Sequence, residues 1–265
     1  MKRPIYQIDA FTSKLFGGNP AAVVLLDEWL PDEILQSVGL ENNLSETAFV
    51  VPGTDAFGLR WFTPEIEVDL CGHATLAAAY VLFNEGSVQG ESVRFDSPSG
   101  QLSVSRDGEI YNLDFPSRPP EPAACTPELV AALGAEPAEV HGARDLLVVY
   151  ETEEAIRALA PRFEALGALD AFAVCVTAPG GPAASGGEVD FVSRFFAPAA
   201  GINEDPVTGS AHCTLIPFWA ERLKKKELRA AQLSKRGGEV FCRDCGDRVL
   251  IGGRAVEYLR GEISL

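Results

Sequence analysis

The segment "DLCGHATLAAAYVLF" (residues 69–83) places a thiol and an imidazole, those of Cys71 and His73, in front of an apolar run. The run predicts a buried helix that begins after Gly72, with Cys71 either a reactive thiol or a small apolar filler. The first N–H groups of a helix have no partner within it and can bind an anion. The segment therefore favours proton-transfer chemistry beside a bound anion.

Two carboxylates could join this pair. Glu46 in "ENNLSETAFVV" directly precedes an apolar strand, and Asp205 in "NEDPVTGSAH" precedes a proline. Each alone is typical of a structural residue, such as a strand-edge carboxylate, a turn residue or a helix cap. His73 is expected to be neutral, since a helix N-terminus disfavours the imidazolium. Together they offer a base, a neutral hydrogen-bond partner and a second acid. Such a set favours removal of a proton α to a carboxylate and its return elsewhere.

An internal repeat must position these groups. "RWFTPEIEVDLCGHATLAAA" (60–79) is similar to "RFFAPAAGINEDPVTGSAHCTL" (194–215): an Arg-aromatic-Phe-x-Pro strand leads through a loop and a glycine turn to an apolar helix. Counting seven residues past each proline aligns Cys71 with Asp205. The repeat predicts two similar halves, each a curled sheet around a central helix. We expect both helix starts to face one cleft and to hold a carboxylate there with their N–H groups.

Strands and helices follow from patterning along the chain. A helix is expected over 31–41 with Pro31 in its first turn, and the proline-dense stretch 116–129 marks the best domain boundary. Residues 178–190 predict an exposed loop. The pair in "FCRDCG" predicts a hairpin turn, because a zinc site would need a second such pair. Strands are predicted at 5–11, 21–26, 47–51, 58–63, 92–97, 101–106, 110–115, 145–150, 171–177 and 189–197, and helices at 128–134 and 152–160.

Composition narrows the classes of partner. The 265-residue chain has a formal net charge of −16, which would repel nucleic acid and anionic membranes. It has no uninterrupted apolar run of membrane-spanning length and no visible secretory signal, so a cytoplasmic protein is expected. The six cysteines are expected to be reduced thiols. No nucleic-acid or membrane partner is expected.

Five motifs in order, "DAFTSKLFGGNPAAVV", "NNLSETAF", "RWFTPEIEVDLCGHATLA", "NEDPVTGSAH" and "GDRVLIGGRAVEYLRGEI", closely resemble the phenazine-biosynthesis isomerase-like (PhzF-like) family, which shares the diaminopimelate epimerase fold. The resemblance implies an α/β (α+β) fold of two pseudo-symmetric domains, each a curled, mainly antiparallel sheet around a central helix. The domains are expected at 1–116, with a final strand at about 254–265 returning to it, and at 117–253. It also implies a homodimer that acts on a small carboxylic acid without metal or organic cofactor.

The resemblance also assigns residues. Glu46 matches the glutamate that removes a proton and returns it elsewhere, His73 the assisting histidine, and Asp205 the aspartate. The phenazine enzyme has a small inert residue where Cys71 stands, whereas epimerase relatives have a catalytic thiol there. Three functions therefore stay open: a cofactor-independent isomerase, an epimerase or racemase of an amino or hydroxy acid that uses Cys71, and a non-catalytic binding or scaffold protein. The substrate-binding residues are expected to be Asn19, Cys71, Gly72, Ala74, Thr75, Gly209 and Ser210.

Overall fold

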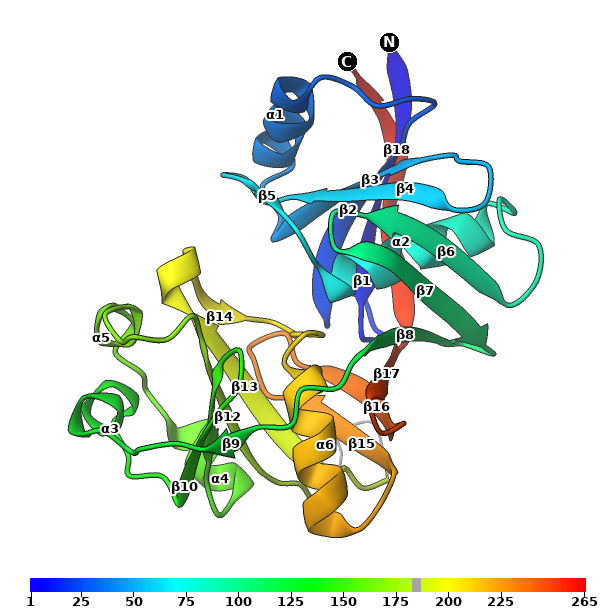
Figure 1. Ribbon diagram of the computed structural model, residues 1–265. Coiled ribbons are helices and arrows are strands. Elements are labelled where there is room, and N and C mark those ends of the chain that lie inside the picture. Colours follow the sequence, from blue (N-terminus) through cyan, green and yellow to red (C-terminus); the bar gives the residue numbers. More distant parts are fainter. Residues whose placement is uncertain (183–186) are drawn as a thin grey trace. The chain divides into compact units, whose positions relative to one another are not determined.

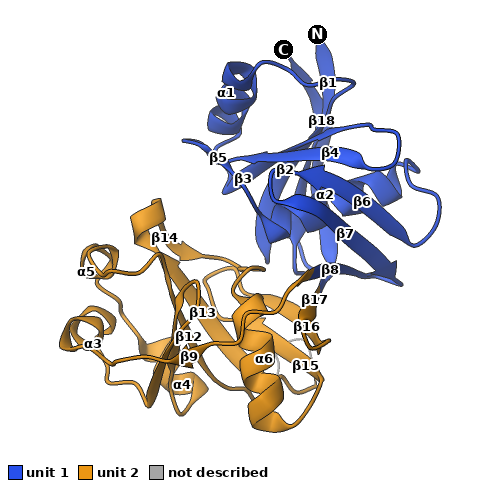
Figure 2. Cartoon of the chain, viewed as in Figure 1, with its two compact units in different colours: residues 1–114, 252–265 blue, residues 115–251 orange. Residues whose placement is uncertain are grey.

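The computed structural model describes residues 1–182 and 187–265 (Figure 1). The chain divides into two compact units, coloured separately in Figure 2. Unit 1 comprises Met1–Asp114 and Gly252–Leu265, and unit 2 comprises Phe115–Ile251. Each unit combines strands and helices in a mixed α/β arrangement. The fold class expected from the sequence is therefore present.

Unit 1 is built on a twisted, mainly antiparallel sheet. Strand β1 (Lys2–Ala10) pairs antiparallel with β2 (Asn19–Leu25) on one side and with β18 (Ala255–Ser264) on the other. The last strand of the chain thus completes the unit that the first strand begins. The remaining strands are β3 (Glu46–Val51), β4 (Phe57–Phe62), β5 (Glu67–Val68), β6 (Ser92–Ser97), β7 (Gly100–Asp107) and β8 (Ile110–Pro116).

The central strands of unit 1 are covered on both faces. Strand β3 is buried at every position, and its alternate residues Phe49 and Val51 pack with helix α1 (Asp32–Asn42). Its other face, which begins with Glu46, is turned toward helix α2 (Gly72–Asn84), because successive side chains of a strand alternate. Nearly every residue of α2 is buried, as expected for a helix that is apolar on all sides.

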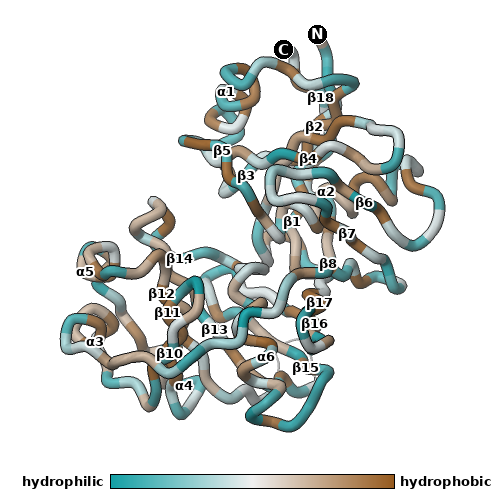
Figure 3. Tube along the Cα trace, in the orientation of Figure 1, coloured by the Kyte–Doolittle hydropathy of each residue, from teal (hydrophilic) through white to brown (hydrophobic). Residues whose placement is uncertain are grey.

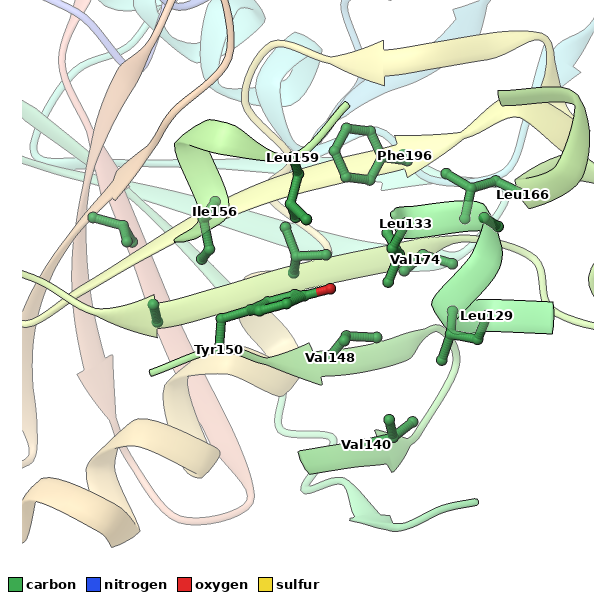
Figure 4. Packing of buried hydrophobic residues seen from close by; sticks show 14 of the residues in the cluster. Leu129, Leu133, Val140, Val148, Tyr150, Ile156, Leu159, Leu166, Val174 and Phe196 are labelled. Atoms are coloured by element: carbon green, nitrogen blue, oxygen red, sulfur yellow. The ribbon is translucent and has the colours of Figure 1, made fainter. Parts of the chain in front are cut away.

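Unit 2 contains a second sheet and a layer of short helices. The helices α3 (Pro127–Leu133), α4 (Glu153–Ala158) and α5 (Phe163–Gly167) pack against the apolar cluster shown in Figure 4. Hydropathy along both units is drawn in Figure 3. The strands are β9 (Glu121–Pro122), β10 (Glu139–Gly142), β11 (Leu146–Val149), β12 (Val174–Pro179), β13 (Phe191–Ala197), β14 (Ile202–Asp205), β15 (Glu227–Gln232), β16 (Gly238–Asp244) and β17 (Arg248–Gly253).

Local chemistry explains why the short helices form where they do. The Thr126 hydroxyl accepts a hydrogen bond from the N–H of Leu129 at the start of α3, and Thr152 accepts one from Ala155 at the start of α4. These side chains satisfy N–H groups that a helix start leaves unpaired. Gly134 ends α3 in the left-handed conformation that glycine adopts at little cost. A short 3₁₀ turn, η1 (Pro198–Ala200), connects β13 to β14.

Helix α6 (His212–Leu223) begins later than the sequence suggests. The N–H groups of His212, Cys213 and Thr214 bond to carbonyls three residues back, so residues 209–211 form a tight turn ahead of the helix. A proline inside a helix usually kinks or ends it, yet α6 continues past Pro217 to Leu223. Proline leaves the carbonyl four residues earlier, that of Cys213, without its helical donor. The N–H of Arg118 donates to that carbonyl at 2.8 Å and replaces the missing bond.

Smaller differences from the sequence-based expectations concern element ends. Pro31 precedes α1 as its N-cap, and the first helical residue is Asp32. In the predicted loop 178–190, β12 extends to Pro179, and Pro182 forms an isolated bridge with Glu188; residues 183–186 lie outside the described part of the chain. In the described parts of the chain, every helix is too short or too polar to cross a bilayer.

Candidate active site

The side chains of Glu46 and His73 meet inside unit 1. Glu46 is the first residue of β3 and faces α2, while His73 is the second residue of α2. The Nε2 atom of His73 lies 3.0 Å from the Oε2 atom of Glu46, and both side chains are buried. This is an ion-pair distance. Apart from His73, no group among the described residues donates to Oε2 of Glu46, so a lone pair of this carboxylate oxygen is left for another proton.

Two further side chains surround the His73 ring. Its Nδ1 atom lies 3.2 Å from Nδ2 of Asn19 and 3.5 Å from Sγ of Cys71. Asn19 begins β2, which pairs in parallel with β3, and that pairing places Asn19 near Glu46. The structure therefore brings together four of the residues expected at the site: Asn19, Glu46, Cys71 and His73.

The surroundings of His73 act on its charge in opposite directions. Burial by itself lowers the pKa of His73, but nearby negative charge, that of the Glu46 carboxylate and of the Cys71 sulfur when it is ionised, raises that pKa well above 6.5. The helix N-terminus acts against protonation with only a partial charge, whereas Glu46 carries a full negative charge at 3.0 Å. The raised pKa favours a protonated ring paired with Glu46 over the neutral ring that the helix start predicts.

Cys71 is the extended N-cap residue of α2. Burial, followed by the negative charge of Glu46, raises the pKa of the Cys71 thiol to about 11, although His73 lowers it in part. A thiol base at a helix start was expected to have a lowered pKa. The raised value favours the alternative in which Cys71 is a protonated, apolar side chain.

Thr75, one of the predicted substrate-binding residues, closes the first turn of α2. Its N–H and its hydroxyl both donate to the carbonyl of Cys71, at 3.2 and 2.6 Å. The N–H groups of Gly72, His73 and Ala74 precede this bond, and that of Ala74 points toward the Cys71 sulfur, whose pKa it lowers in part. These three are the helix-start donors that could receive an anion.

In unit 2, Asp205 ends β14 and lies in a buried polar network. Its Oδ2 atom accepts a hydrogen bond from the Thr208 hydroxyl, and its backbone carbonyl accepts one from Nε2 of Gln232 at 2.8 Å. Gln232 also accepts from the N–H of Thr208 at 2.9 Å. Thr208 and Gln232 carried no sequence signal, because Gln232 comes from β15, which the sequence did not predict. This network fixes the orientation of the Asp205 carboxylate.

Gly209 and Ser210 lie in the tight turn before α6, and their carbonyls accept the first bonds of the helix. Their own N–H groups precede those bonds, as an anion site at a helix start requires. His212 lies in the helix, as expected, and is fully buried. Its Nδ1 atom is 2.9 Å from the carbonyl of Thr208, and burial lowers its pKa to about 4.

Each unit contains a similar arginine–glutamate ion pair next to the segment that leads to its central helix. Arg60 of β4 donates two hydrogen bonds of 2.6 Å to Glu67 of β5. Arg194 of β13 donates hydrogen bonds of 2.7 and 3.0 Å to Glu204 of β14. Both arginines are the first residues of the repeated Arg-aromatic-Phe-x-Pro motif. Bidentate pairs of this kind fix the relative orientation of the two side chains as well as contributing electrostatic attraction. The motif therefore holds a strand-and-return segment in each unit.

A family model described as "Phenazine biosynthesis-like protein" matches residues 8–261. The chain belongs to this family. An isomerase of Pseudomonas aeruginosa, named as uncharacterized, is 54% identical over 100% of both chains. A crystal structure of a PhzF-family phenazine biosynthesis protein from Enterococcus faecalis is 50% identical, covers 100% of both chains and superposes with a TM-score of 0.95.

A more distant structure shares the fold alone. A predicted epimerase from Pseudomonas aeruginosa is 22% identical, covers 98% of this chain and 99% of its own, and has a TM-score of 0.76. The chain thus has the α/β fold common to PhzF-family proteins and diaminopimelate epimerase-like enzymes. Three curated relatives that are 46–54% identical over the full length of both chains are named as isomerases. The chain is therefore an enzyme of the isomerase class.

Proposed function

We propose that the chain is a cofactor-independent isomerase that moves a proton between two carbons of a small carboxylic acid, with Glu46 as the base. One observation carries the proposal. Oε2 of Glu46 is buried and lies 3.0 Å from Nε2 of His73, and no other group among the described residues donates to this oxygen. A buried carboxylate oxygen in a purely structural role normally has its hydrogen-bonding capacity filled. In a base, an oxygen with a single imidazole neighbour keeps a lone pair that can accept a proton from carbon.

Glu46 alone accounts for every proton that moves in the proposed reaction. The carboxylate takes a proton from a carbon next to an unsaturated group, and the electrons of the C–H bond pass into the conjugated system of the substrate. Protonated Glu46 then returns the proton to a different carbon, and the double bond shifts. One base serves both steps, so the enzyme ends with the protons it had at the start. No oxidant or reductant is consumed.

His73 positions the base in this mechanism. Its Nε2 atom lies 3.0 Å from Oε2 of Glu46 and holds the carboxylate in place. Asn19 contacts the opposite ring nitrogen and fixes the orientation of the ring. With the substrate bound next to Glu46, the ring would also face the negative charge that develops on it, which favours the transition state. His73 is thus an assisting residue whose contribution depends on Glu46.

The substrate carboxylate is assigned to the start of α2. The N–H groups of Gly72, His73 and Ala74 open the helix, and the partial positive charge of a helix N-terminus attracts an anion. We also assign Gly209 and Ser210 to substrate binding and Asp205 to the reaction. The repeat aligns Asp205 with Cys71, and both segments precede a helix start. Asp205 is assigned a polarising or positioning role toward the substrate.

An epimerase that uses Cys71 is the second candidate, since Sγ of Cys71 lies 3.5 Å from His73. Epimerisation at one carbon needs two bases on opposite faces of that carbon, and the second would have to be the Cys71 thiolate. Burial raises the pKa of this thiol to about 11, so the thiolate is scarce at neutral pH. The single-base isomerase is therefore preferred.

The isotope pattern in heavy water separates the two functions. Purified protein is incubated in D₂O with a panel of unsaturated, amino and hydroxy acids, and products are analysed by mass spectrometry and NMR. The single-base isomerase predicts a product with a moved double bond that retains part of its original protium, because a buried Glu46 returns some of the abstracted proton. Complete deuteration at one carbon, with inverted configuration, would instead support the Cys71 epimerase. Absence of both exchange and a rearranged product across the panel would favour the scaffold alternative.

A further inference from the structure

Asp205 lies at the end of a chain of hydrogen bonds whose direction can be worked out from one backbone group. The N–H of Thr208 can only donate, so the Gln232 atom that it meets at 2.9 Å is the amide oxygen Oε1. The other end of this amide is Nε2, which lies 2.8 Å from the backbone carbonyl of Asp205 and 3.2 Å from Oγ1 of Thr208. An amide nitrogen only donates, so Gln232 gives a hydrogen bond to each of these oxygens.

The direction of that amide sets the direction of the Thr208 hydroxyl. Its Oγ1 atom accepts from Gln232, and its single proton is donated to Oδ2 of Asp205. A hydroxyl that donates to a carboxylate favours the ionised form over the neutral acid. The chain of bonds therefore favours Asp205 as a carboxylate with one oxygen held by Thr208, which suits a polarising group and not a proton donor.

The backbone of Thr208 is held on both sides, which restricts where its hydroxyl can lie. Its N–H donates to Gln232, and its carbonyl accepts from Nδ1 of His212 at 2.9 Å. All four residues of this network, including Asp205, are buried. Contacts to the backbone thus hold the segment, and the hydroxyl of Thr208 extends that order to the carboxylate.

The internal repeat shows that this last bond is particular to unit 2. Cys71 and Asp205 occupy equivalent positions after the repeated proline, and a threonine follows each of them within four residues. In unit 1 the hydroxyl of Thr75 donates to the backbone carbonyl of Cys71 at 2.6 Å and closes a helical turn. In unit 2 the hydroxyl of Thr208 donates to the side chain of Asp205. The first contact stabilises the backbone, whereas the second orients a carboxylate.

We infer that Thr208 is a positioning residue for the reaction, because its hydroxyl, oriented by Gln232, holds the Asp205 carboxylate in a single orientation for the substrate. The effect on turnover rests on the proposed function, whereas the orientation of the carboxylate is a property of unit 2 alone. Thr208 acts through Asp205, so its contribution to turnover cannot exceed that of the carboxylate.

Crystal structures of variants test the positioning without any measurement of turnover. Thr208→Val removes the hydroxyl but keeps the N–H and the carbonyl, so the backbone contacts with Gln232 and His212 should persist. We expect the Asp205 carboxylate to rotate or to occupy two orientations in this variant, and to keep its wild-type orientation in Thr208→Ser. If Thr208→Val fails to fold, Thr208→Ala takes its place. A single, unchanged orientation without the hydroxyl would overturn the positioning role.

Kinetics on a responsive acid test the consequence for the reaction. Thr208→Val should lower kcat by about threefold to tenfold with KM nearly unchanged, because the lost hydrogen bond supports the transition state. Thr208→Ser should restore most of the rate. Thr177→Val is the matched control: it removes another buried hydroxyl of unit 2, which donates to Val192 and accepts from Trp219, and should leave kcat unchanged. Equal losses in Thr208→Val and Thr177→Val would point to a structural effect and contradict the inference.

A double-mutant cycle decides whether Thr208 acts through Asp205. In an Asp205→Ala background no carboxylate is left to position, so the addition of Thr208→Val should cause no further loss in kcat/KM. A further loss as large as that in the wild type would overturn the inference. If the wild type neither exchanges nor rearranges any acid of the panel, the proposed function fails, while the crystal structures still decide whether Thr208 positions Asp205.

Discussion

Nε2 of His73 lies 3.0 Å from Oε2 of Glu46, and both groups are buried. This relationship joins the start of β3 to the first turn of α2, two segments separated by 27 positions in the chain. It raises the pKa of the imidazole, and no other described residue donates to this carboxylate oxygen. The proposal for proton transfer depends on it.

Cys71 should react slowly with alkylating agents at neutral pH, because burial raises the pKa of its thiol to about 11. Iodoacetamide treatment followed by peptide mass mapping should modify the exposed Cys125 and Cys245 first. Cys71→Ala should then lose far less than the roughly hundredfold that removal of a general base costs. Labelling of Cys71 as fast as Cys125, together with a loss of that size, would support the epimerase.

His212 should make stability fall in mild acid. Burial lowers the pKa of His212 to about 4 from 6.5, and its buried Nε2 has no hydrogen-bond partner among the described residues. The unfolded chain thus binds this proton more readily than the folded chain. The stabilisation is complete above about pH 6.5 and decreases toward pH 4, by up to about 3 kcal/mol.

The check on His212 is urea unfolding at pH 7 and pH 4.5, in the wild type and in His212→Asn. The decrease in the free energy of unfolding between the two pH values should be smaller in the variant, because asparagine does not titrate. Other groups that titrate in this range contribute equally to both proteins. Equal decreases in wild type and variant would show that His212 is not the cause.

The Arg194–Glu204 bridge should matter more to stability than its counterpart Arg60–Glu67. The side chains of Arg194 and Glu204 are 12% and 22% exposed, against 20% and 32% for Arg60 and Glu67. Arg194 also donates to the carbonyls of Ile156 and Leu159. Urea unfolding should show that Glu204→Gln lowers stability by about 1–2 kcal/mol. The matched Glu67→Gln should cost less, and the reverse order would contradict this ranking.

Asp205→Asn should lower turnover less than loss of the base. The amide keeps the size of the side chain and can still accept the hydrogen bond from the Thr208 hydroxyl, so the local network of unit 2 should persist. A polarising role predicts a loss of about tenfold in kcat/KM, below the range for a general base. Steady-state kinetics on the responsive acid give the value, and a loss equal to that of a Glu46 variant would assign Asp205 a proton-transfer role.

The sequence predicts the secondary elements of unit 1 well because its strands are short, regular and bounded by turn residues. Helix α2 follows from the apolar run after Gly72. Strands β14 and β15 were missed: β14 is only four residues long, and β15 alternates with charged and small residues that carry a weak strand signal. Helix α6 begins at His212 rather than directly after Gly209, because a tight turn and a helix share the same local sequence pattern.

The site was predictable in its residue types but not in its contacts. Glu46 and His73 were named from composition and motif, yet their separation depends on the alternation of β3 and on which face α2 covers. The sequence predicts a neutral His73, because it indicates the helix N-terminus but not the contact with the Glu46 carboxylate. The Gln232 contact with Asp205 joins residues 27 positions apart through β15 and has no local signal.

Glu46→Gln tests the central claim most directly. Glutamine keeps the size of the side chain and removes the base, so folding and carboxylate binding should persist. The measured quantity is the initial rate of deuterium incorporation from D₂O into the responsive acid. We predict a loss of roughly a hundredfold to ten-thousandfold in Glu46→Gln, and an unchanged rate in the control Glu65→Gln, whose side chain is exposed. Incorporation at the wild-type rate in Glu46→Gln would contradict the role of Glu46 as the base.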